Sequence, residues 1–194
     1  WNGAASFVVV LLGALALPVV TYGWAGNLSQ LHEWWVVVTT STAPNLAGQD
    51  NISIAGMWAA WLGIGTPAAW LSAVTGLALL AACGWAVTRG SRVESPDYLD
   101  ASLLLFAIPL LSPQGWDYVL LVSTPAVMLL LDRLDLLDRP IQWLLWGSLA
   151  LIGLTFWDVL GRDLFKALMM SRALTVCALF EFGVLVHLRL RRAA

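Results

Sequence analysis

The chain has 194 residues, of which 60% are hydrophobic and 11% are charged, and its formal net charge is -2. Its mean hydropathy is +0.80. Soluble domains average about 45–50% apolar residues, so this composition excludes an ordinary soluble protein and predicts a protein of the lipid bilayer. The sparse charge also excludes the basic surface that nucleic-acid binding requires. Cys83 and Cys177 lie within apolar runs, so neither indicates a disulfide or a metal site.

Six apolar stretches are predicted to cross the membrane as helices, because a helix satisfies its own backbone hydrogen bonds within lipid. In chain order they are Gly3–Tyr22, Ala68–Val87, Leu99–Leu111, Trp116–Leu131, Ile141–Trp157 and Arg172–Leu188. The third is short and contains Pro109. A further apolar run, Ile52–Ile64, is too short to span comfortably and is interpreted as an interfacial or re-entrant helix. We therefore expect an all-α, polytopic transmembrane helix bundle that forms a single domain over residues 1–194.

The basic residues are divided unevenly between the two sides of this topology. One side carries Arg89, Arg92, Arg133, Arg139, Arg189, Arg191 and Arg192. The other side carries Arg162, Lys166 and Arg172. Because basic residues concentrate in cytoplasmic connections, the first side is predicted to be cytoplasmic. The connections at 24–67, 112–115 and 158–171 are then extracytoplasmic.

The first outward connection holds two polar segments. Asn27–Trp35 is predicted to form an N-capped amphipathic helix whose paired tryptophans lie at headgroup depth, which makes an interfacial helix pair with Ile52–Ile64. Asp50, Asn51 and Ser53 precede the second helix of this pair. They form either a helix cap or a site at the membrane surface for a polar or anionic group.

The second outward connection combines aromatic and polar side chains. Gln114, Trp116, Asp117 and Tyr118 follow one another closely between two apolar helices. Flat aromatic faces accept the apolar side of a sugar ring, while carboxylate and amide groups hydrogen-bond to its hydroxyls. The segment is therefore either a sugar-binding turn or an ordinary interfacial turn.

The third outward connection carries cations on the side where they are disfavoured. Asp158, Arg162 and Lys166 are spaced at i, i+4 and i+8, on one face of a continuous helix, and Arg172 follows. They form either a ladder of salt bridges or a site for a lipid phosphate. Glu181 lies within the sixth predicted span, where a carboxylate is costly and indicates either a functional role or a partner within the bundle.

The two polar turns resemble those of the polyprenyl-phosphate-mannose-dependent mannosyltransferases of glycosyltransferase family 87, which have the GT-C architecture. The first turn matches the family pattern at Asn51, Ser53, Ile54 and Gly56, with Ile52 in place of the usual Gln. The second matches at Ser112, Pro113, Trp116, Tyr118 and Pro125. Some relatives have a His after the tryptophan, and this chain does not, so a role for that His is not carried over.

The resemblance implies a GT-C-like fold and an inverting transfer of a hexose, with mannose as the family's sugar. The donor would be a polyprenyl-phosphate sugar, and the acceptor a glycolipid or glycan on the extracytoplasmic face of a bacterial cytoplasmic membrane. Neither a metal nor a further cofactor is indicated. The family's presumed catalytic base lies in an N-terminal half, so we expect this chain to be the C-terminal half of a longer enzyme and to be inactive alone.

The resemblance and the residues together define the candidate site. The expected sugar-binding residues are Asp50, Asn51, Ser53, Gln114, Trp116, Asp117 and Tyr118. Asp117 is also a candidate contributor to catalysis. The expected lipid-phosphate ligands are Arg162, Lys166 and Arg172.

Two other classes of function remain open. Glu181 in mid-membrane and the span interrupted by Pro109 are compatible with half of a transporter or flippase. A transporter predicts a repeat-related half upstream, whereas a glycosyltransferase predicts an upstream outward loop with an acidic residue. The third alternative is a structural membrane subunit without chemistry.

Overall fold

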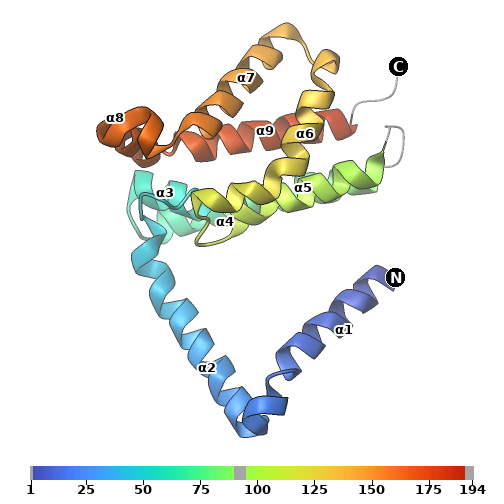
Figure 1. Cartoon of the computed structure of the whole chain (residues 1–194), viewed down its shortest axis with the longest axis vertical. Coiled ribbons are helices and arrows are strands. Elements are labelled where there is room, and N and C mark those ends of the chain that lie inside the picture. The colour runs from blue at the N-terminus through green and yellow to red at the C-terminus, as the bar shows by residue number, and fades with distance from the viewer. Residues whose placement is uncertain (1, 90–94, 191–194) are drawn as a thin grey trace. The chain divides into compact units, whose positions relative to one another are not determined.

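The computed structural model describes residues 2–89 and 95–190 (Figure 1). Trp1, Arg92, Arg191 and Arg192, of which the three arginines entered the predicted membrane orientation, lie outside the described residues. Within the described ranges every regular element is a helix, which confirms the all-α prediction. The chain divides into two compact units, Trp1–Ala43 and Pro44–Ala194.

The first unit contains helix α1 (Asn2–Ala16) and most of helix α2 (Val19–Leu46). The two helix axes are bent by 87° at the break between them. Asn27 lies inside α2, so the prediction that it caps the start of a helix is wrong. Its side-chain amide instead donates to the carbonyl oxygen of Leu15 at 3.0 Å, near the end of α1. Helix α2 is itself interrupted before Asn27, at Gly23, whose positive φ of 67° suits glycine.

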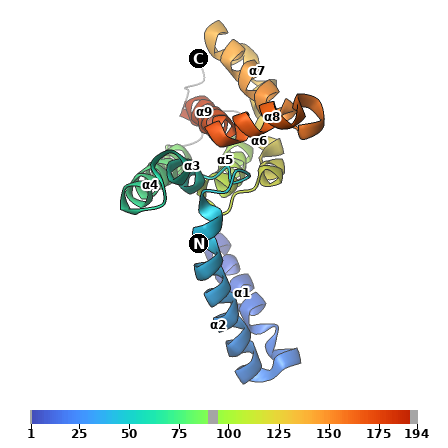
Figure 2. The same ribbon diagram turned by 90° about the vertical axis from the view of Figure 1, so that its left-hand side faces the viewer.

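The second unit contains the remaining helices. They are α3 (Ile54–Leu62), α4 (Thr66–Thr88), α5 (Pro96–Leu111), the 3₁₀ helix η1 (Asp117–Ser123), α6 (Thr124–Asp132), the 3₁₀ helix η2 (Leu134–Leu136), α7 (Arg139–Leu154), α8 (Trp157–Ser171) and α9 (Ala173–Leu190). Four of these helices, α4, α5, α6 and α7, have a proline in the first turn, where its fixed φ and missing N–H are tolerated. In both views α9 lies between α7 and the layer formed by α4 and α5 (Figures 1 and 2).

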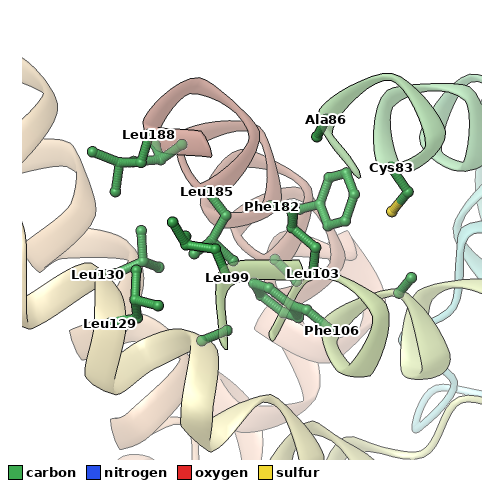
Figure 3. Packing of buried hydrophobic residues seen from close by; sticks show 14 of the residues in the cluster. Cys83, Ala86, Leu99, Leu103, Phe106, Leu129, Leu130, Phe182, Leu185 and Leu188 are labelled. Carbon is green, nitrogen blue, oxygen red and sulfur yellow. The ribbon is translucent and has the colours of Figure 1, made fainter. Parts of the chain in front are cut away.

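The core of the second unit gathers buried side chains from several helices, and most of them come from α5 and α9 (Figure 3). Phe106 of α5 and Phe182 of α9 meet with ring centroids 6.4 Å apart at an interplanar angle of 62°. Leu99, Leu103, Leu185 and Leu188 extend this contact along both helices. At its end, the Arg189 guanidinium Nε lies 2.7 Å from the Asp100 carboxylate, so one ion pair also joins α5 to α9.

Two helices, α4 and α9, are each long and apolar enough to cross a membrane. The bent pairs α1–α2 and α7–α8 raise the number of candidate spans within residues 2–89 and 95–190 to four if each pair is one span. The protein is thus consistent with membrane residence, and the six predicted spans are not confirmed. The predicted fourth span, Trp116–Leu131, is divided between η1 and α6. Helix α3 has nine residues, about 14 Å of helix, which is too short to cross a hydrocarbon core of about 30 Å.

Candidate functional site

Asn51 joins two loops that are far apart in the sequence. Its side-chain amide donates to the carbonyl oxygens of Leu46 and Pro113, both at 3.0 Å. Its side-chain oxygen accepts from the backbone N–H of Ser53 at 3.0 Å and of Gly115 at 3.1 Å. These four bonds use both amide hydrogens and both lone pairs of the carbonyl oxygen. Asn51, which is 5% exposed, therefore fastens the two predicted polar turns together and has no polar group left for a sugar.

The backbones of the two turns approach each other closely around Asn51. The N–H of Ile52 donates to the Gly115 carbonyl oxygen at 2.6 Å. A Cβ atom on Gly115 would lie 2.3 Å from the Pro109 carbonyl oxygen, and one on Gly56 would lie 2.7 Å from the Asn51 Cγ. No real Cβ atom tolerates such contacts, so both positions require glycine for close approach rather than for an unusual φ.

Ser53, the next predicted site residue, is fully buried and caps α3. Its hydroxyl oxygen accepts from the backbone N–H of Gly56 at 3.0 Å. Asp50 is exposed and Gln114 is half-buried, and neither side chain makes a hydrogen bond with another described residue. Of the residues in these turns, Asp50 and Gln114 thus keep polar groups available, whereas Ser53 is used as a cap.

Arg172 holds the same loop from the other side. Its Nη1 donates to the carbonyl oxygens of Gln49 at 2.8 Å and Asn51 at 2.9 Å, and its Nη2 donates to that of Ala47 at 2.9 Å. The residue is 3% exposed. We refer to residues 47–53, 113–116 and Arg172 as the Asn51 junction. The interpretation of Arg172 as a lipid-phosphate ligand does not fit this geometry, because the guanidinium is buried and committed to backbone carbonyls.

The electrostatics of Arg172 reflect its burial. Desolvation lowers the pKa of its guanidinium from the ordinary value, and the nearby Asp50 carboxylate partly offsets this effect. The residue also adopts a left-handed backbone conformation, with φ of 63°, which costs a side-chain-bearing residue about 1–2 kcal/mol. Hydrogen bonds from a charged donor contribute about 1.5–3 kcal/mol each. The three bonds to the loop therefore oppose the backbone strain.

Beside the junction in the sequence, Asp117 and Tyr118 line a cavity of about 340 Å³. Its walls come from η1, α6, the break between α7 and α8, and the start of α9. Most of the lining is apolar, with Leu121, Ile152 and Leu174 among the contributing side chains. We refer to this space as the Asp117 cavity.

The polar groups of the Asp117 cavity are partly unused. The Asp117 Oδ1 accepts from the backbone N–H of Tyr118 at 2.8 Å. Its Oδ2 has no hydrogen-bond partner among the described residues. Thr124 and Thr155 donate their hydroxyls to carbonyl oxygens of the preceding turn. The Trp116 and Tyr118 rings, 47% and 62% exposed, lie 5.7 Å apart and form a tilted aromatic pair. Asp117, with its free carboxylate oxygen, and Tyr118 thus line one cavity, and the Trp116 ring packs against Tyr118.

Asp158, Arg162 and Lys166 do not share one helical face. Gly161 has a positive φ of 71° and interrupts α8 between the aspartate and the two cations. The i, i+4 relation therefore holds only from Arg162 to Lys166, and the prediction that all three residues share one helical face is wrong. The guanidinium carbon of Arg162 instead lies 5.0 Å from the ring centroid of Trp157. Both cations are exposed, so they keep the capacity to bind an anion.

Glu181 is 1% exposed between α7 and α9. Its Oε1 accepts from the hydroxyl of Ser148 at 2.7 Å. No basic side chain among the described residues pairs with it. The partner within the bundle is thus a neutral hydroxyl rather than a cation.

Several residues of the site were missed at the level of sequence. The only sequence signal near Gly115 is a proline two residues earlier. That proline indicates a turn, but it does not indicate that the backbone of Gly115 packs closely against another segment. Ile152, Gly153 and Phe156 line the Asp117 cavity because α7 ends at Leu154. The apolar sequence around that break carries no strong signal for it.

Within residues 2–89 and 95–190, no group of three His, Cys, Asp or Glu side chains is arranged to hold a metal ion. No family model, curated protein or solved structure matches the chain.

Proposed function

We propose that the chain is part of a membrane glycosyltransferase that transfers a hexose from a polyprenyl-phosphate donor to a glycolipid or glycan acceptor. The observation that carries the proposal is the Asp117 cavity, whose apolar wall ends at an unpaired carboxylate oxygen and a phenol. A lipid-linked sugar has the same two parts, an apolar chain and a polyhydroxylated head. Mannose is the expected sugar from the family resemblance alone.

The apolar wall supports binding of the isoprenoid chain. Leu121, Ile152 and Leu174 come from three different helical segments and face one space of about 340 Å³. Pockets that bind small apolar ligands fall in a range of about 300–1,000 Å³ and carry a few polar groups that fix orientation. The cavity therefore suits the part of an isoprenoid nearest its phosphate.

The polar edge supports binding of the sugar. The Asp117 Oδ2 is free to accept from a sugar hydroxyl, and the tilted Trp116–Tyr118 pair offers aromatic faces for a pyranose ring. In this proposal Asp117 and Tyr118 bind and orient the sugar. The acid–base group of the transfer is assigned to none of the described residues.

The phosphate is assigned to the cations of α8. Phe156 lines the cavity, Trp157 follows it directly, and Arg162 stacks over the Trp157 ring. Lys166 lies one turn further along the same helical segment as Arg162. These exposed cations replace Arg172 in the proposal, because the Arg172 guanidinium is buried and donates three hydrogen bonds to backbone carbonyl oxygens of the Asn51 junction.

The experiment fills the cavity and measures binding rather than turnover. Gly153 lines the cavity, and a Cβ there meets no atom within 4 Å, so the Cβ of Gly153→Phe is accommodated and its ring is added beside the cavity. Gly147→Phe is the matched control, since Gly147 is on the same helix, has the same free space and lies outside the cavity. The purified chain in nanodiscs is photolabelled with a diazirine-bearing polyprenyl phosphate, and labelled peptides are mapped by mass spectrometry.

We expect labelling on η1 and on the segment between α7 and α8, reduced severalfold by Gly153→Phe and unchanged by Gly147→Phe. Equal labelling of both variants would show that the polyprenyl phosphate does not bind in the Asp117 cavity. Absence of labelling on the unmodified chain would favour a structural subunit.

Transport is the second candidate, and the buried Glu181 of α9 favours it. Glu181→Gln keeps an acceptor for Ser148 and removes the ionisable group. If the unmodified chain shows proton-linked uptake in proteoliposomes and Glu181→Gln loses it, while labelling by the polyprenyl phosphate probe stays intact, the chain is assigned to transport. Intact labelling without any proton-linked uptake by the unmodified chain supports the transferase.

A further inference from the structure

A second cavity, of about 470 Å³, lies between η2 and the first two turns of α7. It is lined by Leu134, Asp135, Arg139, Gln142, Trp143 and Trp146. We refer to it as the Trp143 cavity. It shares no lining residue with the Asp117 cavity, so an inference drawn from it is independent of the proposed function.

The Trp143 cavity contains two opposite charges that do not neutralise each other. Asp135 of η2 and Arg139 of α7 are both exposed and both line it. Neither forms an ion pair or a side-chain hydrogen bond with the other or with any other described residue. A ligand with only a negative group would face the Asp135 carboxylate, and one with only a positive group would face Arg139. The pair instead matches a ligand that carries both charges.

The two backbone segments that carry these charges are tied together by a third residue, Gln142. The side-chain amide of Gln142 donates to the carbonyl oxygens of Leu134 at 2.9 Å and Leu137 at 2.8 Å. These bonds tie the segment that carries Asp135 to the helix that carries Arg139. The fold therefore holds the backbone positions of Asp135 and Arg139 on the two segments that line the cavity.

Two tryptophans complete the Trp143 cavity. Arg139, Trp143 and Trp146 are spaced at i, i+4 and i+7, which places them on one face of α7. Trp143 is 75% exposed and Trp146 is 49% exposed. Tryptophan faces attract ammonium groups, and exposed tryptophans at the end of a membrane helix lie at headgroup depth. Helix α7 belongs to a candidate span, and these residues lie at its first turns.

We infer that the Trp143 cavity binds the headgroup of a zwitterionic phospholipid. The phosphate contacts the Arg139 guanidinium, and the ammonium group contacts the Asp135 carboxylate and the tryptophan faces. Phosphatidylethanolamine and phosphatidylcholine share this chemistry, whereas phosphatidylglycerol has the phosphate without the ammonium group.

Native mass spectrometry of the full chain tests the inference. The purified protein is equilibrated in micelles with equal amounts of the three phospholipids, which carry the same acyl chains, and the retained lipids are counted. We expect the two zwitterionic lipids to be retained about two- to fivefold over phosphatidylglycerol, the range expected for one ion pair near solvent. Retention of phosphatidylethanolamine above phosphatidylcholine would assign recognition to hydrogen bonds that the lipid ammonium N–H groups donate to the Asp135 carboxylate. Equal retention would assign recognition to charge and to the tryptophan faces.

Variants identify the residues that carry the preference. Asp135→Asn should abolish the preference over phosphatidylglycerol, Asp135→Glu should retain it, and Arg139→Gln should lower retention of all three lipids by a similar factor. Asp138→Asn and Arg89→Gln are matched controls, because both residues are exposed and outside the cavity, and Arg89 also stacks on a tryptophan. Equal retention of all three lipids by the unmodified chain, or an undiminished preference in Asp135→Asn, would overturn the inference.

Discussion

The Asn51 junction and the Asp117 cavity are neighbours in the sequence and differ in where their hydrogen bonds go. In the junction, the four bonds of Asn51 and the three from Arg172 all end on backbone groups of the same unit. In the cavity, the Asp117 Oδ2 has no partner among the described residues. The boundary falls between Trp116, whose backbone pairs with Asn51, and Asp117.

This difference separates residues that build a site from residues that can use it. A buried amide whose donors and acceptors are all satisfied contributes to stability, because removing it leaves several buried groups unpaired. A carboxylate oxygen without a partner at an open cavity contributes little to stability and is available to a ligand. Three substitutions test the comparison, from the largest expected effect on stability to the smallest.

Asn51→Ala is expected to have the largest effect. It leaves two carbonyl oxygens and two N–H groups without partners, and each unpaired buried group costs about 1–3 kcal/mol, so we expect a loss of at least about 3 kcal/mol. The measurement is reversible denaturation in detergent followed by circular dichroism. Asn45→Ala, at an exposed position with no side-chain hydrogen bond, should change stability by no more than about 0.5 kcal/mol. Equal stability of the two variants would contradict the role of Asn51 as a junction.

Arg172→Lys is expected to have an intermediate effect. Lysine keeps the charge and loses the planar fork that reaches three carbonyl oxygens, so we expect a loss of about 1.5–3 kcal/mol. Arg89→Lys is the control, since Arg89 is exposed at the end of α4. If Arg172→Lys were as stable as the control but weakened labelling by the polyprenyl phosphate probe, Arg172 would belong with the ligand-binding residues instead.

Asp117→Asn is expected to have the smallest effect on stability, within about 0.5 kcal/mol, because its free oxygen bonds to no described residue. Its effect on binding should be large. Loss of a hydrogen bond to a charged group, at about 1.5–3 kcal/mol, lowers affinity for polyprenyl-phosphate mannose about 10- to 100-fold. Binding is measured by thermophoresis in nanodiscs, with the exposed Asp132→Asn as control. Unchanged affinity in Asp117→Asn would exclude Asp117 from the sugar site.

The sequence predicted some elements well and others poorly. The apolar runs Ala68–Val87 and Arg172–Leu188 correspond within two residues to α4 and α9, because an uninterrupted apolar run is a strong local signal for a helix. The continuation of α2 to Leu46 was not predicted, since its polar residues read as a loop. The break at Gly161 was also missed, because a single glycine is compatible with an intact helix until packing selects a positive φ.

The candidate site was predicted in composition and not in organisation. Asn51, Trp116 and Arg172 were all chosen from sequence, and the structure brings them together in one junction. Their separate roles were not predictable, because nothing in the local sequence of Asn51 indicates that Pro113 and Gly115 will use its amide.

The sequence by itself determined that this protein is helical and consistent with membrane residence, because hydropathy and backbone hydrogen bonding in a helix depend on residues close together in the chain. Only the tertiary structure decided that the side-chain amide of Asn51 is fully hydrogen-bonded, that both terminal nitrogens of Arg172 bind backbone carbonyl oxygens, and that the Asp117 Oδ2 has no partner among the described residues. The physical reason is that satisfaction of a hydrogen bond depends on its partner, and here the partners come from segments distant in the sequence.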